Sequence, residues 1–304
     1  GILPPAASAG VGVVIVLQLM RLAQCFGRGG TWGGGILMAY ENVPENKRSF
    51  YAAIPQIGLP IGFGLSSILI AVPTLLLPED IFFTWGWRIP FLAAIILTVI
   101  VIRQKGEMME TEDYKKAQAK LEAEEAEGKK HKVGFIPMVK GYWKTLLLGC
   151  GTRWVDGTFY NIFIVWILSY CINWLGMPLI QTYIITIIAC IFKIPFTLFG
   201  GWCAQKLGNT RTFVIGALAS AVLSIPTLKV IELSKGNLAI TIIGIVLGWS
   251  IAYNLIWAVI SSLWSSYFET EVRYSGISFV YHVPSFLVAG MVPTICTLLI
   301  NYGK

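Results

Sequence analysis

Long apolar stretches alternate with short polar links along nearly the whole chain. Runs such as 11–19, 180–192 and 238–249 carry no charged residue. Extended by their neighbours, these runs reach the roughly 20 residues that a helix needs to cross about 30 Å of hydrocarbon. The pattern therefore predicts an all-α, polytopic membrane protein. Eight spans are expected, at residues 9–40, 48–77, 87–105, 144–174, 179–205, 211–231, 237–267 and 273–302.

One charged segment interrupts this pattern. Ten Lys or Arg and eight Asp or Glu lie between Arg103 and Lys144. Because residues 107–132 are rich in Ala, Glu and Lys, we expect a solvated, partly helical linker there rather than a binding site. The segment divides the chain into three predicted domains. They are a partial N-terminal bundle of three spans at 1–105, the linker at 106–143, and a partial C-terminal bundle of five spans at 144–304.

Basic residues in the links give an orientation. The alternate links are poorer in Lys and Arg, and positively charged links tend to stay in the cytoplasm. The linker 106–143 is therefore expected to be cytoplasmic, and eight spans then place both chain ends outside. The basic residues that follow odd-numbered spans, apart from those of the linker, are Lys47, Arg48, Lys206, Arg211 and Arg273.

Composition argues against several classes of function. Only 13% of the residues are charged, about half the average for soluble domains. The net charge of +7 lies in the links, so it indicates topology rather than nucleic-acid binding. Six scattered cysteines form no CxxC pair, and two histidines do not make a metal cluster. No GxxxxGK[ST] loop indicates ATP use, and no Ser/His/Asp constellation indicates an enzyme. We expect no cofactor.

Two motifs identify a family. Residues 21–35, RLAQCFGRGGTWGGG, resemble the pattern RxxQGxxxGGEWGGA in the fourth helix of the metabolite:proton symporter branch of the major facilitator superfamily. Glycines at this density suit close contact between helices. Residues 85–91, WGWRIPF, match the start of that branch's sixth helix and form the most specific motif of the chain.

Two links carry further matches. Residues 268–276 resemble the FPTxxRYSG turn before the eleventh helix, and residues 201–211 loosely resemble the GxxxDRxGRR loop between helices eight and nine. The resemblance spans the chain from the fourth helix to the eleventh. It implies about eight of the twelve helices of a major-facilitator fold, in the plasma membrane of a prokaryote, and hence a fragment. Residues at the positions implied to control the conformational cycle are Gly201, Gln205, Gly208, Arg211 and Arg273.

The chain departs from the family pattern at five positions. Thr31 stands where the pattern has Glu, Gln205 replaces the loop Asp, and Asn209 replaces an Arg. Glu269 replaces a Pro, and Arg28 is an additional charge. Since the loop acid helps to latch one conformation in the family, conformational control is expected to differ here. Thr31 leaves open a uniporter or antiporter without proton coupling. The altered loop leaves open a scaffold or sensor that does not transport.

The resemblance implies secondary transport of small organic solutes by alternating access, with the proton gradient as driving force and without ATP. Five charged residues within the spans sum to +3, which favours an anionic substrate such as a carboxylate. Asp156 is the candidate proton carrier. Because four missing helices would expose polar faces to lipid, the 304-residue chain alone is expected not to transport. The five charged residues are Arg21, Arg28, Arg153, Asp156 and Lys193.

Each candidate also has a plainer interpretation. Arg153 and Asp156 could simply neutralise each other, and Lys193 could pair with a carbonyl. Two sets of residues share a helical face through the spacing i, i+3, i+7, and they are Arg21, Gln24 and Arg28, and Arg153, Asp156 and Tyr160. Further candidates, whose alternative is an ordinary contact between helices, are Gln56, Tyr253, Asn254 and His282.

Overall fold

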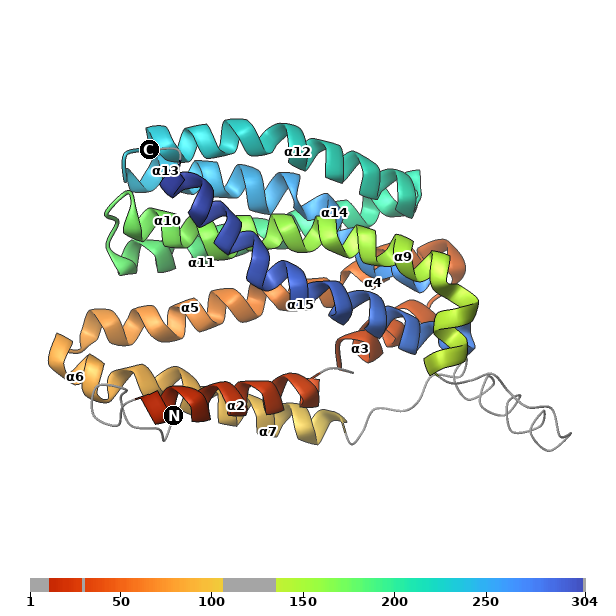
Figure 1. Cartoon of the computed structure of the whole chain (residues 1–304), viewed down its shortest axis with the longest axis horizontal. Coiled ribbons are helices and arrows are strands. Elements are labelled where there is room, and N and C mark those ends of the chain that lie inside the picture. The colour runs from red at the N-terminus through yellow and green to blue at the C-terminus, as the bar shows by residue number, and fades with distance from the viewer. Residues whose placement is uncertain (1–10, 29–30, 106–134, 303–304) are drawn as a thin grey trace, which may run out of the picture.

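The computed structural model describes residues 11–28, 31–105 and 135–302. Throughout these ranges the long elements are helices, which run along one elongated bundle (Figure 1). The predicted all-α membrane fold is confirmed. Seven segments in the described ranges are long and apolar enough to cross a membrane: Glu45–Leu76, Gly86–Arg103, Met138–Asn173, Leu179–Leu207, Asn209–Leu233, Leu238–Ser265 and Val272–Tyr302.

The first expected span, 9–40, is not among these seven. It is described as two helices, α2 (Val11–Arg28) and α3 (Thr31–Glu41). Glycines crowd the sequence around their junction, and glycine has a low helix propensity. Arg21 also ends the apolar run, so only Val11–Met20 is apolar enough to register as a shorter segment.

We call the described residues up to 105 the N-terminal block and those from 135 onward the C-terminal block. The rest of the N-terminal block is built around one long apolar helix. That helix, α5, ends where Leu77 turns to an extended backbone before Pro78. The elements of this part are the 3₁₀ turn Glu45–Lys47, α4 (Arg48–Ala53), the 3₁₀ turn Pro55–Ile57, α5 (Gly58–Leu76), α6 (Glu79–Thr84), the 3₁₀ turn Gly86–Arg88 and α7 (Ile89–Lys105).

The C-terminal block opens with α9 (Phe135–Tyr160), which begins earlier than the span expected at 144. The backbone leaves the helical region at Tyr142, with φ −114° and ψ 21°. The kink separates a short first part of the helix from the membrane-length part. A π-helical turn, η4 (Asn161–Trp166), then joins α9 to α10 (Ile167–Asn173), so one continuous helical span ends at Asn173.

Four more spans complete this block. Gly208 adopts φ +91° between two of them, a conformation that suits glycine and ends one helix before the next begins. Asn237 caps another, since its side-chain oxygen accepts a hydrogen bond from the amide of Ile240 at 3.2 Å. The elements are α11 (Leu179–Leu207), α12 (Asn209–Leu233), α13 (Leu238–Ile245), the π-helical turn η5 (Val246–Ala252), α14 (Asn254–Ser265) and α15 (Thr270–Tyr302).

Helix α11 packs on both blocks, against α5 and α4 on one side and α14 on the other. Two consecutive glycines permit this. A methyl group added at Gly200 would lie 2.6 Å from the Cβ of Ala258 in α14, and one at Gly201 would lie 2.6 Å from the Cβ of Ala53 in α4. Close approach of helices through small residues is typical of membrane proteins.

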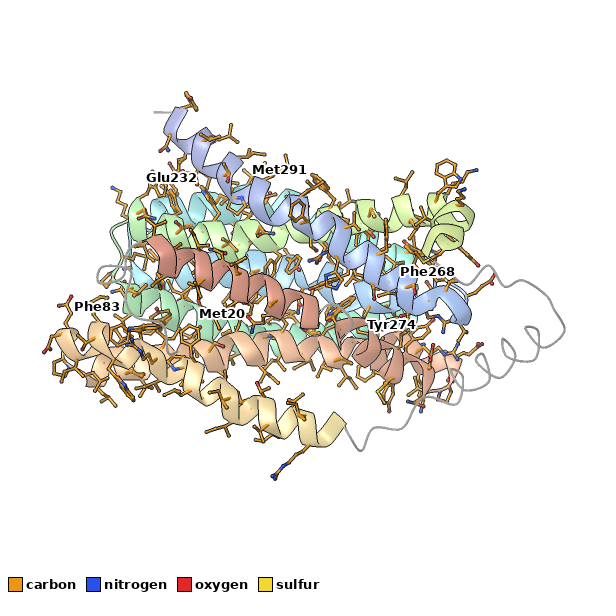
Figure 2. All side chains as sticks on the ribbon, turned by 60° about the horizontal axis from the view of Figure 1, so that its bottom comes forward. Met20, Phe83, Glu232, Phe268, Tyr274 and Met291 are labelled. Carbon is orange, nitrogen blue, oxygen red and sulfur yellow. The ribbon has the colours of Figure 1, made fainter. Side chains whose placement is uncertain are left out.

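The bundle has two distinct ends. Helix α7 ends and α9 begins at the same end, on the right in Figure 1. We call it the linker end. Helix α2 starts and α15 finishes at the opposite end. In Figure 2, Phe268 and Tyr274 lie near the linker end of α15, and Met291 lies towards its other end, where large apolar side chains are exposed as a lipid-facing surface requires.

Candidate functional site

A buried ion pair on α9 forms the centre of the site. Arg153 donates from Nη1 to Oδ2 of Asp156, and the Asp156 side chain is fully buried. Tyr253, which follows η5, donates its hydroxyl to the other carboxylate oxygen, Oδ1, at 2.6 Å. Arg153 also donates from Nε to the hydroxyl of Ser285 in α15, at 2.9 Å. The carboxylate therefore has both oxygens engaged, and the pair connects three helices.

Aromatic rings cover the guanidinium of Arg153. Its Cζ lies 4.2 Å from the centroid of the Tyr281 ring, a cation–π distance. Trp32 of α3 stacks on the same tyrosine with centroids 4.2 Å apart, and Trp264 meets that tyrosine edge-on at 6.2 Å. Because α3 precedes the linker, the N-terminal block reaches the ion pair through Trp32.

A second cation lies close by on α11. Lys193 is fully buried, and its Nζ lies 4.7 Å from the centroid of the Trp249 ring and 4.5 Å from that of Tyr253. Its hydrogen bond is a long one, 3.4 Å to the carbonyl of Trp249. It lies within electrostatic range of Asp156. An ammonium carries three N–H donors, so this contact leaves the group sparsely hydrogen-bonded.

Two of the predicted polar residues form hydrogen bonds that hold helices together, and these bonds do not involve the charged side chains. Asn254 donates to the main-chain carbonyl of Lys193 at 2.9 Å and bonds with the hydroxyl of Thr197, which ties α14 to α11. Gln56 donates to the carbonyl of Trp257 at 3.2 Å, and the indole of that tryptophan donates back to the carbonyl of Gln56 at 3.1 Å. These reciprocal bonds hold the N-terminal block against α14.

The other predicted site residues divide into near and distant ones. Tyr160 lies near the pair, within electrostatic range of Arg153 and Asp156, and its ring lies 6.3 Å from that of Phe63 in α5. Gln24 is exposed on α2, and His282 is exposed on α15 beside Tyr281. The side chains of Arg21 and Arg28 lie outside the described residues.

The structure therefore assembles part of the predicted set. Arg153, Asp156 and Lys193 form a cluster whose charges, +1, −1 and +1, sum to +1. The expected excess of +3 included two arginines whose side chains lie outside the described residues. Sequence reasoning missed the following contributors: Trp32, Trp249, Trp264, Tyr281 and Ser285. Helical spacing offered a faint signal, since Tyr281 and Ser285 are four residues apart.

A second group of contacts joins the two blocks at the linker end. Arg273 donates from Nη1 to Oε1 of Glu41 at 2.6 Å, and the two side chains are only 14% and 5% exposed. Arg273 also donates from Nε to the carbonyl of Phe268 at 3.1 Å. The family resemblance singled out Arg273. Its partner Glu41 was missed, because it lies 232 residues away in the sequence.

Gln205 strengthens this junction. Its amide nitrogen donates to the carbonyl of Asn46, and its amide oxygen accepts from the amide of Phe50 at 3.4 Å. Gln205 therefore bonds to the N-terminal block without a charge. Asn209 accepts a hydrogen bond from Ser262 at 3.0 Å within the C-terminal block, and Arg211 is exposed. In the described part of the chain no group of three His, Cys, Asp or Glu could hold a metal.

Comparison with known proteins gives a consistent result. The sequence pattern of the Major Facilitator Superfamily matches residues 2–293. An inner membrane metabolite transport protein of Escherichia coli, YhjE, is 29% identical over 309 residues, which cover 100% of this chain and 68% of that protein. The shikimate transporter of the same organism is 28% identical over 309 residues, covering 99% of this chain and 67% of that protein.

A proline/betaine transporter of Escherichia coli is also similar, with 27% identity over 306 residues. The match covers 100% of this chain and 60% of that protein. The chain thus spans between three fifths and about two thirds of the length of these relatives.

Proposed function

The chain belongs to the Major Facilitator Superfamily, and we propose that it is part of a proton-coupled symporter for a small, carboxylate-bearing solute. It is a transporter rather than an enzyme, since its relatives are named as transporters. The observation that carries the proposal is the buried cluster of Arg153, Asp156 and Lys193, whose formal charges sum to +1.

The excess positive charge supports an anionic solute. Charged groups within the membrane are costly and normally pair with one another or with a ligand. While it is ionised, Asp156 neutralises one of the two cations, so one formal positive charge remains to attract a solute carboxylate. The name of the shikimate transporter agrees with this chemistry, because shikimate is a carboxylate anion, whereas proline and betaine carry their carboxylate within a zwitterion.

The position of Asp156 supports proton coupling. Its carboxylate is shared by Arg153 and the hydroxyl of Tyr253. When Asp156 takes up a proton, it loses the charge that holds the guanidinium. Arg153 then has donors available for a solute carboxylate, which it can bind through two parallel hydrogen bonds. Loss of the proton restores the ion pair and displaces the solute, so proton and solute are bound and released together.

One alternative rests on a specific position. Thr31 stands where the symporter pattern has Glu, which favours a uniporter or antiporter of the same fold. In that case Asp156 stays paired with Arg153 throughout the cycle and has a structural role. A protonophore separates the two mechanisms, since it abolishes accumulation only when transport is coupled to protons. Any solute uptake rules out a scaffold or sensor that does not transport.

The test is uptake of labelled succinate and labelled glycine betaine by vesicles containing the product of the complete open reading frame. We expect succinate to accumulate and a protonophore to abolish the accumulation. Asp156→Asn should exchange solute but no longer accumulate it. Asp80→Asn, which changes an exposed acid of α6, is the matched control and should behave as wild type. Uptake of betaine alone would refute the proposed charge of the solute. Accumulation insensitive to the protonophore would refute the coupling.

A further inference from the structure

We infer that Lys193 determines which charge type of solute the site accepts, because its ammonium occupies an aromatic clamp formed by Trp249 and Tyr253. The inference rests on the proposed function. It narrows the substrate class to solutes with a net negative charge, and it excludes zwitterions whose quaternary ammonium would need the same clamp.

The clamp has the geometry of a cation site. Both ring centroids lie within 5 Å of Lys193 Nζ, at 4.7 Å for Trp249 and 4.5 Å for Tyr253. Cations up to about 6 Å from a ring centroid are attracted by its π system, and quaternary ammonium groups are recognised in this way. The two aromatic residues are four apart around the π-helical turn η5, and π turns often occur at functional sites. In this chain the lysine itself supplies the cation.

Lys193 is bonded too sparsely for a purely structural lysine. It is fully buried, yet its hydrogen bond in the described structure is the 3.4 Å contact with the Trp249 carbonyl. The buried indole nitrogen of Trp249 also has no hydrogen-bond partner among the described residues. Two groups that donate hydrogen bonds thus lack good acceptors, and an anion supplies acceptors. The main chain of Lys193 is held separately, by Asn254.

Substitutions that change the charge of the cluster should reverse the preference for anionic over zwitterionic solutes. With Lys193 present, the cluster carries +1, which suits an anion. Lys193→Met removes one positive charge, so Arg153 and Asp156 leave a neutral site whose aromatic clamp holds no cation. The flexible, uncharged methionine can move aside from the rings, so that site suits a zwitterion such as glycine betaine. Adding Asp156→Asn to Lys193→Met restores +1 from Arg153, so the double variant should prefer anions again.

The test uses the complete open reading frame and vesicles loaded with unlabelled solute, so that exchange of labelled succinate or glycine betaine is measured without a proton gradient. We expect the ratio of succinate to betaine exchange to fall at least tenfold in Lys193→Met. In the Asp156→Asn/Lys193→Met variant it should recover to within about threefold of wild type, a change of roughly 0.65 kcal/mol or less. Lys193→Arg keeps the charge and should keep the preference.

The outcomes separate the two claims. Wild-type vesicles that exchange neither solute overturn the proposed function and this inference together. Wild-type vesicles that exchange succinate, with Lys193→Met keeping the same ratio, overturn the inference alone. A fall in Lys193→Met without recovery in the double variant also overturns it, because a structural role would give that result. If Lys193→Met does not reach the membrane, Lys193→Gln replaces it in both variants with the same expectations.

Discussion

The ion pair between Glu41 and Arg273 is expected to hold the two blocks together at the linker end. Replacing the acid by Glu41→Gln removes the charge but keeps the size of the side chain. Arg273 then keeps its bond to the carbonyl of Phe268 but loses its ionic partner. Because the pair joins α3 to α15, the change should favour separation of the blocks at this end and leave the fold of each block intact.

The burial of the ion pair determines how much free energy Glu41→Gln costs the closed arrangement. Exposed ion pairs contribute about 0.2–1 kcal/mol, whereas removing one partner of a fully buried pair costs about 3–5 kcal/mol. At 5% and 14% exposure the two side chains are largely but not fully buried. We therefore expect a loss of about 2 kcal/mol for the closed arrangement, which corresponds to a roughly 30-fold change in its opening equilibrium.

Hydrogen-exchange mass spectrometry of the protein in lipid nanodiscs measures this equilibrium directly. Peptides covering residues 41–50 and 268–274 should exchange about 30-fold faster in Glu41→Gln, because exchange follows the free energy of local opening. The matched control is Glu45→Gln. Glu45 pairs with Arg48 within the N-terminal block at 3.1 Å, and its side chain is 88% exposed. That variant should change exchange by less than about threefold.

A double-mutant cycle sharpens the test. If the contact is the cause, Glu41→Gln combined with Arg273→Gln should open the linker end by less than the sum of the two single changes. Exchange rates in Glu41→Gln that match those of Glu45→Gln would refute the reasoning. So would additive effects in the double variant, since they would show that the two side chains do not act on each other.

Two further changes test the same junction. Gly201→Ala places a methyl group 2.6 Å from the Cβ of Ala53, so it should lower stability by about 1–3 kcal/mol and lower the melting temperature. Gly34→Ala, which meets nothing within 4 Å, should leave the melting temperature unchanged within about 2 °C. Gln205→Ala removes both hydrogen bonds to the backbone of the N-terminal block and should destabilise the junction by about 1–2 kcal/mol. Arg211→Ala, at an exposed position, should leave the junction unchanged. Hydrogen exchange measures both variants.

Hydrophobicity alone predicts most of the fold, for a physical reason. A lipid-exposed backbone must satisfy its own hydrogen bonds, so a sufficiently long apolar run forms a helix. Seven of the eight expected spans appear as described helices of membrane length. The exception, at 9–40, combines many glycines with Arg21, and in such a stretch neither apolar length nor helix propensity is sufficient.

The site could be predicted only where its contacts are local. Arg153 and Asp156 are three residues apart, and this spacing places them on one face of a helix. The hydroxyl that completes the pair belongs to Tyr253, 97 residues beyond Asp156. Such contacts depend on how each helix is tilted and rotated against its neighbours, which apolar length does not determine. The pairing of Glu41 with Arg273 could not be predicted for the same reason.

The stack of Trp32, Tyr281 and Arg153 connects the N-terminal block to the buried ion pair. The sequence did not predict this connection. Tyr281 stacks on Trp32 of the N-terminal block and also lies 4.2 Å from the guanidinium of Arg153. A rocking motion that separates α3 from α15 must break the junction between Glu41 and Arg273, and it also draws Trp32 away from Tyr281. Tyr281 then loses its stacking partner but keeps the edge-on contact with Trp264, so its cation–π contact with Arg153, worth about 1 kcal/mol, is expected to weaken. We therefore expect the ion pair with Asp156 to respond to the position of the N-terminal block, as the proposed proton coupling by alternating access requires.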